Sequence, residues 1–317
     1  MKTWLTAFIF ALAACNAGAQ PYPAKPVRIV VGFAPGGGSD FIARLVAQKL
    51  TERFGTQVLV ENRPGAGSML AAEIVVKSPA DGYTILLSAA SYTVNPSLYK
   101  LTFDPLNDIT PIVQLSKGPY VIAVHPSVPA RTLQELVELA RREPGKLAYA
   151  SSGNGSHVHA ATEFFLDTAK IRMLHVPYKG TGPALNDTIA GNAQLILGSV
   201  ATALQHVKSG RLRALAVTTP KRIAAAPDVP TVAESGYPTY EVTNWHGLVG
   251  PKGLPKEIVD RLNKEVNEAL TSPDAAKLLA ADGLEPAGGS PEALAVILRE
   301  EIARWGRVVR QAGLKLE

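Results

Sequence analysis

From Pro26 onward, short apolar runs alternate with longer segments whose apolar residues recur at helical spacing. The run Pro26–Phe33 suits a strand buried on both faces, and Phe41–Phe54 suits a helix that ends at Gly55. The same order continues with a strand at Gln57–Val60, a helix at Met69–Val76 and a strand at Tyr83–Ser88. Strands that alternate with crossover helices predict a parallel sheet.

The alternation begins again near Tyr120. We expect a helix at Thr132–Arg142, because Thr132 and Glu135 have the spacing of a capping box. The other elements predicted for this second unit are strands at Tyr120–Val124, Lys146–Ala150, Met173–Val176, Gln194–Leu197 and Leu212–Val217, and helices at His157–Ala169, Pro183–Ala190 and Ala201–Val207. The sequence therefore predicts a second doubly wound α/β unit.

The segment after Gly250 is predicted to be helical and to contain no strand. Helices are expected to begin at Pro255, Pro273 and Pro291, where the missing proline N–H costs nothing. Their apolar stripes must cover a surface, and the first sheet offers one, so the chain would pass between the two units twice. We predict an α/β fold of two doubly wound lobes joined by a two-strand hinge, with lobe 1 formed by residues 20–119 and 248–317 and lobe 2 by residues 120–247.

The first 19 residues have the layout of a secretory signal peptide. Lys2 is followed by a short apolar run, which is well below the roughly 20 residues that cross a bilayer. Two processing interpretations stay open, since Ala17-Gly18-Ala19 fits a cleavage site and Leu12-Ala13-Ala14-Cys15 resembles a lipoprotein box. Both predict export to the periplasm, and the second predicts a lipid anchor at Cys15.

Composition argues against several classes of protein. The formal net charge is +5 and the basic residues are scattered, so we expect no binding to nucleic acid. A single Cys excludes a disulfide framework and a thiolate metal site. With 46% hydrophobic residues, the chain can form cores of ordinary size.

Three glycine-bearing loops stand where predicted strands lead into helices. Backbone N–H groups at such helix ends bind anions, and ligands of open α/β sheets bind beyond the carboxyl ends of the strands. The candidate ligand-binding residues in these loops are Phe33, Pro35, Gly36, Gly37, Gly38, Ser39, Asp40, Asn154, Gly155, Ser156, Lys179, Gly180, Thr181 and Gly182. Asp40 is expected to cap the first helix or to order water, and His159 to offer a hydrogen bond from the start of its helix.

The same loops lack the patterns of several other sites. Gly36-Gly37-Gly38 fits neither nucleotide-binding glycine motif, and His157 and His159 lack the helical spacing of metal ligands. Ser199 has Ala in place of the second Gly of a nucleophile elbow, and Asp40 and Asp187 are not paired as acid and base. We therefore expect no catalytic residue, no metal and no cofactor.

Several motifs, spread over nearly the whole chain, point to a known family. They are Tyr22-Pro23, Lys25-Pro26-Val27-Arg28, Phe33 to Asp40, Glu61-Asn62-Arg63-Pro64-Gly65-Ala66-Gly67, Pro79-Ala80-Asp81-Gly82-Tyr83, His175-Val176-Pro177-Tyr178-Lys179-Gly180, Pro230-Thr231-Val232-Ala233-Glu234 and Trp245-His246-Gly247-Leu248. With these motifs the sequence resembles the extracytoplasmic solute receptors of tripartite tricarboxylate transporters, the Bug family. The resemblance implies a periplasmic-binding-protein type II, or Venus flytrap, fold.

The resemblance also implies a ligand and a site. A carboxylate would be bound between the loops Gly36–Ser39 and Thr181, with Ser88, its neighbour Ala89 and Asn154–Ser156 contacting the rest of the ligand. Small residues at Gly198 and Ser199 suggest a roomy far wall, so mono-, di- and aromatic carboxylic acids all stay open. The implied partners are this ligand and membrane transporter subunits, and we expect a monomer. A periplasmic sensor and an exported α/β hydrolase are the alternatives.

Overall fold

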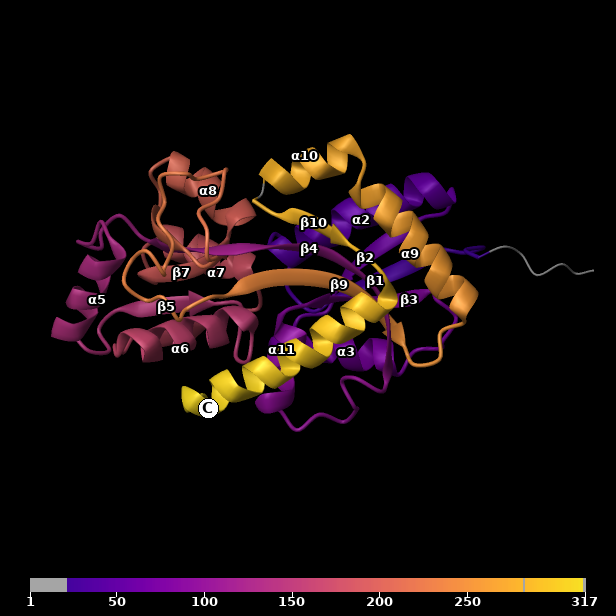
Figure 1. The fold of residues 1–317 in the computed structure, drawn as a ribbon, viewed down its shortest axis with the longest axis horizontal. Coiled ribbons are helices and arrows are strands. Elements are labelled where there is room, and N and C mark those ends of the chain that lie inside the picture. The colour runs from indigo at the N-terminus through magenta and orange to yellow at the C-terminus, as the bar shows by residue number, and fades with distance from the viewer. Residues whose placement is uncertain (1–21, 282, 316–317) are drawn as a thin grey trace, which may run out of the picture.

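The computed structural model describes residues 22–281 and 283–315. The predicted signal peptide and Cys15 lie outside these residues. The strands form one mixed sheet in the order β2-β1-β3-β9-β4-β7-β5-β6, with β8 and β10 also paired to β4. Helices cover both faces, and the molecule has two halves that lie side by side (Figure 1). The predicted two-lobe α/β fold is confirmed, and we refer below to the half with β1 as lobe 1 and the half with β5 as lobe 2.

Lobe 1 contains the predicted parallel strands. The strand β1 (Val27–Val31) lies between β2 (Val58–Asn62) and β3 (Thr84–Ala89) and is parallel to both. The connecting helices are α2 (Gly38–Phe54), η1 (Ala66–Ser68), α3 (Met69–Val76), α4 (Ser91–Val94) and η2 (Asn95–Ser97). Gly55 ends α2 in the left-handed conformation, at φ 65°, as the sequence predicts.

Lobe 2 contains a shorter parallel group. The strand β5 (Ala148–Ser151) is parallel to β6 (Leu174–Pro177) and β7 (Leu195–Ser199), whereas β8 (Arg213–Val217) and β7 both run antiparallel to β4. The helices are α5 (Leu133–Arg142), α6 (His157–Ala169), α7 (Thr181–Ile189) and α8 (Val200–Lys208). At the start of α5, Glu135 N donates to Thr132 Oγ1 at 3.1 Å, so the expected capping interaction is present.

Two long antiparallel strands join the lobes. The strand β4 (Ile109–Val124) pairs with β9 (Thr243–Pro251) over its first part and with β7 and β8 over its last part. The strand β9 also pairs with β3 in lobe 1. Neither β9 nor the first part of β4 was predicted from the sequence. These two strands form the predicted hinge.

The prediction that strands stop after Gly250 is wrong. The strand β10 (Glu285–Gly288) pairs antiparallel with β4, between the helices α10 (Pro273–Ala281) and α11 (Pro291–Gln311). Its sequence, Glu-Pro-Ala-Gly, is only four residues long and has no alternation of apolar and polar residues. Since two of the four residues are exposed, the strand needs no such alternation, and no pattern in the sequence predicted it. The predicted helix starts near Pro255, Pro273 and Pro291 are confirmed by α9 (Lys256–Leu270), α10 and α11.

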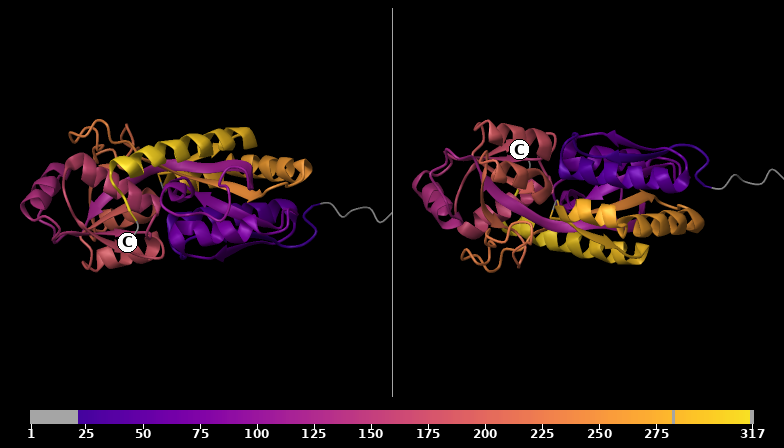
Figure 2. Two further views of the ribbon diagram at one scale, coloured as in Figure 1. Left: turned by 90° about the horizontal axis from the view of Figure 1, so that it is seen from below. Right: turned by 90° about the horizontal axis from the view of Figure 1, so that it is seen from above.

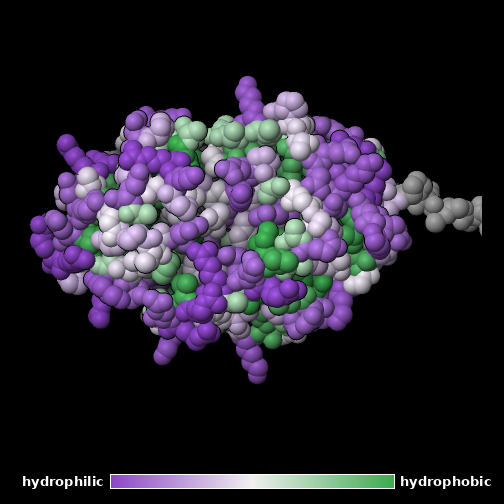
Figure 3. Space-filling model, in the orientation of Figure 1, coloured by the Kyte–Doolittle hydropathy of each residue, from purple (hydrophilic) through white to green (hydrophobic). Residues whose placement is uncertain are grey.

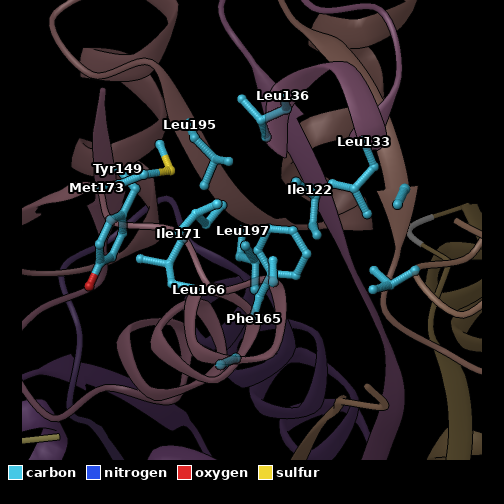
Figure 4. Close-up of a cluster of buried hydrophobic side chains, with 14 of the residues drawn as sticks. Ile122, Leu133, Leu136, Tyr149, Phe165, Leu166, Ile171, Met173, Leu195 and Leu197 are labelled. Carbon is cyan, nitrogen blue, oxygen red and sulfur yellow. The ribbon is translucent and has the colours of Figure 1, made fainter. Parts of the chain in front are cut away.

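The last helix contributes to the cores of both lobes. Leu294 and Leu298 of α11 pack beneath the lobe 1 sheet, whereas Trp305 and Val309 belong to the largest lobe 2 core. That core also contains the buried residues labelled in Figure 4. Figure 2 shows α11 extending from lobe 1 across to lobe 2. The proposed lobe boundaries stay a prediction, but α11 crosses between the lobes in addition to β4 and β9.

The surface is mostly polar. In Figure 3, hydrophilic residues cover most of both ends of the visible face, and smaller groups of hydrophobic residues lie between them. In the part of the chain that the structure describes, no helix is both long and apolar enough to span a membrane.

Candidate functional site

A small cavity of about 30 Å³ lies between the lobes, where strands of both lobes end and helices begin. Seven of the residues predicted from the sequence line it. They are Phe33, Gly37, Gly38, Ser39, Ala89, Thr181 and Ser199. Their role in ligand binding stays a prediction, but the fold brings them together from two segments of lobe 1 and two of lobe 2 in one place.

The loops of the two lobes touch directly beside this cavity. Ala34 N donates a hydrogen bond to the carbonyl oxygen of Lys179, with an N···O distance of 2.8 Å. A Cβ atom on Gly180 would lie 3.0 Å from Ala34 N, at a φ of 154° that favours glycine. The predicted residues Pro35, Gly36, Lys179, Gly180 and Gly182 thus form the contact between the lobes beside the cavity and do not line it.

Two helix N-termini face each other across the cavity. The backbone N–H groups of Gly38 and Ser39 in α2, and of Thr181 and Gly182 in α7, have no hydrogen-bond acceptor within residues 22–281 and 283–315. A Cβ atom on Gly37 would lie 3.5 Å from Gly182 N and 3.6 Å from Thr181 N, so the two helix ends are close. Each end has a partial positive charge of about half an elementary charge. Such an arrangement attracts an anion.

Asp40 supports the first glycine loop by hydrogen bonding. Its carboxylate accepts hydrogen bonds from Gly36 N, at 3.1 Å, and from the side chains of Arg44 and Asn62. Burial alone would raise the pKa of Asp40, but these donors outweigh burial and lower it below its usual value. Asp40 is therefore a charged carboxylate that holds the glycine loop, and it does not line the cavity.

Most of the polar side chains of the cavity wall were not predicted from the sequence. The lining residues that were not predicted are Ser91, Tyr120, Ser152, Val158, Asn244 and His246. Tyr120 Oη donates to Asn244 Oδ1 at 3.0 Å and lies 3.0 Å from His157 Nδ1. Asn244 and His246 lie on β9, where the polar–apolar–polar order of Asn244, Trp245 and His246 was the available signal.

The cavity wall is uncharged. Burial lowers the pKa of His246 to about 4 and that of His157 to about 3, so both rings are neutral at pH 7. Among the described residues, no Asp, Glu, Lys or Arg lines this cavity. Backbone N–H groups and neutral hydroxyl, amide and imidazole groups are therefore the available polar contacts.

The remaining predicted residues lie elsewhere. Ser88 is buried and does not line the cavity, and its Oγ has no hydrogen-bond partner among the described residues. Ser156 Oγ caps α6 by accepting from His159 N at 3.2 Å. His159 Nδ1 accepts from Gly155 N at 3.2 Å, and its ring stacks on His175 with centroids 3.9 Å apart. His159 thus faces a different pocket, shared with Glu163 and His175.

Asn154 and Gly155 form a second contact between the lobes. Tyr99 Oη in lobe 1 donates to the carbonyl oxygen of Asn154 in lobe 2, at 2.9 Å. A Cβ atom on Gly155 would lie 2.5 Å from the Tyr99 ring. These two predicted residues therefore contact lobe 1 directly and not the cavity.

Comparison with known proteins identifies the family. Residues 42–314 match the family model described as the tripartite tricarboxylate transporter family receptor. Protein BugT of Bordetella pertussis is 36% identical over 307 residues, which cover 96% of this chain and 94% of BugT. A protein of R. palustris solved with adipate is 36% identical with a TM-score of 0.90, and the match covers 93% of this chain and 99% of that one. MatC from Rhodopseudomonas palustris, solved with bound malate, is 31% identical with a TM-score of 0.88, over 91% of this chain and 100% of MatC. This chain therefore belongs to the tripartite tricarboxylate transporter receptor family, the TctC or Bug solute-binding receptors.

Proposed function

We propose that this protein is an exported periplasmic receptor that binds a small carboxylate between its lobes and delivers it, unmodified, to a tripartite membrane transporter. The main support is the pair of facing helix ends, because their unbonded N–H groups converge on one place from both lobes. An anion there contacts both lobes only when they are closed, so it raises the population of the closed form. The transporter would recognise that closed form.

The ligands of two relatives support a carboxylate. Adipate and malate, each named with one solved relative, are small acids with carboxylates at both ends. The uncharged wall of this cavity offers no cation to a second carboxylate. The preferred ligand is therefore an acid that places one carboxylate against the helix ends and a neutral polar or apolar group against the wall.

A hydrolase is the second candidate, and one observation favours it. Ser39 Oγ lies 3.2 Å from His246 Nε2, and His246 Nδ1 lies 3.1 Å from Ser116 Oγ, which superficially resembles a nucleophile, a base and an orienting group. Ser116 is neutral and cannot stabilise an imidazolium, and a pKa of about 4 makes His246 a weak base. The earlier candidate Ser199 bonds to Thr202 Oγ1 at 2.9 Å. Binding without turnover is the better account.

The first test compares acids with their esters. We expect calorimetry to detect binding of at least one acid in a panel of mono-, di- and aromatic carboxylates that includes adipate and malate, and no binding of its methyl ester. Mass spectrometry of the incubated ligand should show an unchanged mass. Failure of every acid, equal binding of the ester, or hydrolysis of the ester would contradict the proposal.

Uptake distinguishes a transport receptor from a sensor. A strain that lacks the gene should lose uptake of the bound acid, and the intact gene should restore it. Normal uptake together with altered gene expression would favour the sensor.

Export and the oligomeric state need separate measurements. Fractionation of cells with the native chain and with Cys15→Ala tests export and the lipid anchor. Light scattering tests whether the protein is a monomer.

A further inference from the structure

His246 connects a fully buried serine to the ligand cavity. Its Nδ1 atom lies 3.1 Å from Ser116 Oγ on β4, and its Nε2 atom lies 3.2 Å from Ser39 Oγ at the start of α2. Ser116 is 0% exposed and His246 is 1% exposed. Ser39 and His246 line the cavity and Ser116 does not. The three side chains thus form a short hydrogen-bonded chain that leads from the hinge to the ligand cavity.

The direction of hydrogen donation along this chain follows from the number of available donors. A neutral imidazole has one N–H donor and one acceptor nitrogen, so one neighbouring serine must donate to it and the other must accept from it. Within the described part of the chain, Ser116 Oγ has no hydrogen-bond partner other than His246. If His246 donated from Nδ1, the buried Ser116 O–H would have no acceptor, which is costly. Ser116 therefore donates to Nδ1, and the His246 proton is on Nε2.

This direction decides the role of Ser39. When His246 donates from Nε2 to Ser39 Oγ, the Ser39 O–H is left to point into the cavity that Ser39 lines. With the opposite direction, the Ser39 O–H would donate to His246 Nε2, and only a lone pair of Ser39 Oγ would face the ligand. A carboxylate accepts hydrogen bonds and cannot donate them, so only the first arrangement suits it.

We propose that Ser116 and His246 are positioning residues that make the Ser39 hydroxyl a hydrogen-bond donor to the bound carboxylate. This inference rests on the proposed function and names the side chain that assists the helix ends. Ser116 acts from a distance, through the His246 ring.

The tautomer of His246 is the direct test. Protein labelled with ¹⁵N at histidine gives long-range proton–nitrogen spectra that distinguish a protonated Nε2 from a protonated Nδ1. The His246 signals are assigned by their loss in His246→Gln. We expect the Nε2–H tautomer in the free protein and in the protein with an acid bound. The Nδ1–H tautomer would overturn the inference.

Affinity measurements test the coupling through the ring. With adipate and malate as probes, Ser116→Ala should weaken binding about tenfold, which corresponds to roughly 1.4 kcal/mol. In a Ser39→Ala background, Ser116→Ala should cause no further loss, because the donor that it positions is already absent. The coupling would be refuted if Ser116→Ala weakened binding by the same factor in the Ser39→Ala background as in the wild type. It would also be refuted if Ser116→Ala alone had wild-type affinity.

Two controls separate this inference from other failures. Ser235→Ala removes a buried serine hydroxyl that donates to Thr231 O at 2.9 Å, outside the cavity lining, and should leave affinity unchanged. Wild-type protein that binds no acid would count against the proposed function. The tautomer measurement would still decide the direction of donation.

Discussion

Gly182 of lobe 2 lies so close to Pro35 of lobe 1 that a Cβ atom on Gly182 would stand 2.9 Å from the Pro35 carbonyl oxygen. Gly182 is in the first turn of α7 and does not need a left-handed backbone, so its lobe alone would accept alanine. Glycine is therefore required at this position by the contact between the lobes and not by the helix. The contact also gives a way to perturb closure without perturbing the fold.

Gly182→Ala should weaken carboxylate binding at least tenfold, because the added methyl group opposes the closed form. The free protein should be as stable as the wild type or more stable by about 0.5–1 kcal/mol, since alanine favours a helix over glycine. Calorimetry gives the affinity and denaturant unfolding gives the stability. A variant that binds normally would show that the two loops need not approach this closely.

Tyr99→Phe should destabilise the closed form by about 0.5–1.5 kcal/mol, because it removes the hydrogen bond from Tyr99 Oη to Asn154 O. The expected effect is faster ligand release, up to about tenfold, in stopped-flow displacement. The melting temperature without ligand should change little, since the bond joins the two lobes and is not part of the core of either. A much lower melting temperature with an unchanged rate of ligand release would show that this bond stabilises the fold of the free protein and not the closed form.

Tyr120→Phe should lower the free energy of unfolding by about 1–3 kcal/mol. The Tyr120 hydroxyl is buried, and its loss leaves Asn244 Oδ1 and His157 Nδ1 without this partner. Because Asn244 lines the cavity, its amide should also lose its fixed orientation and affinity should fall. Urea unfolding and calorimetry on the same samples test the two effects, and a variant with unchanged stability would contradict the first.

Stability should fall as the pH is lowered from about 6.5 toward 4. Burial lowers the pKa of His246 to about 4, so this ring stays neutral in the folded protein while it gains a proton in the unfolded chain. The unfolded state binds more protons in that window, so the free energy of unfolding rises with pH there and the contribution is complete above pH 6.5. The slope should approach about 1.4 kcal/mol per pH unit for this histidine. His246→Asn should reduce the slope, and an unchanged slope would mean that His246 does not titrate in this way.

The sequence alone determined the features that depend only on residues adjacent in the chain, which are helices, strands, caps and turns. The helix Met69–Val76 was predicted at its observed bounds, and the glycine loop before α2 was predicted to be an anion site, because periodicity, caps and turns are local properties. The family motifs also lie in continuous segments. For the same reason, seven residues of the cavity wall could be selected before the fold was known.

The tertiary structure decided how distant segments meet. His246 was visible in a motif, but its place between Ser39 and Ser116 depends on β9 pairing with β4, and residues 130 and 207 positions apart in the chain come into contact. His159 was selected because it lies at a helix start, but its ring stacks on His175 of β6, and that contact depends on how α6 packs beside β6. Strand pairing and the closing of two lobes are set by the packing of the whole chain, and no window of neighbouring residues contains that information.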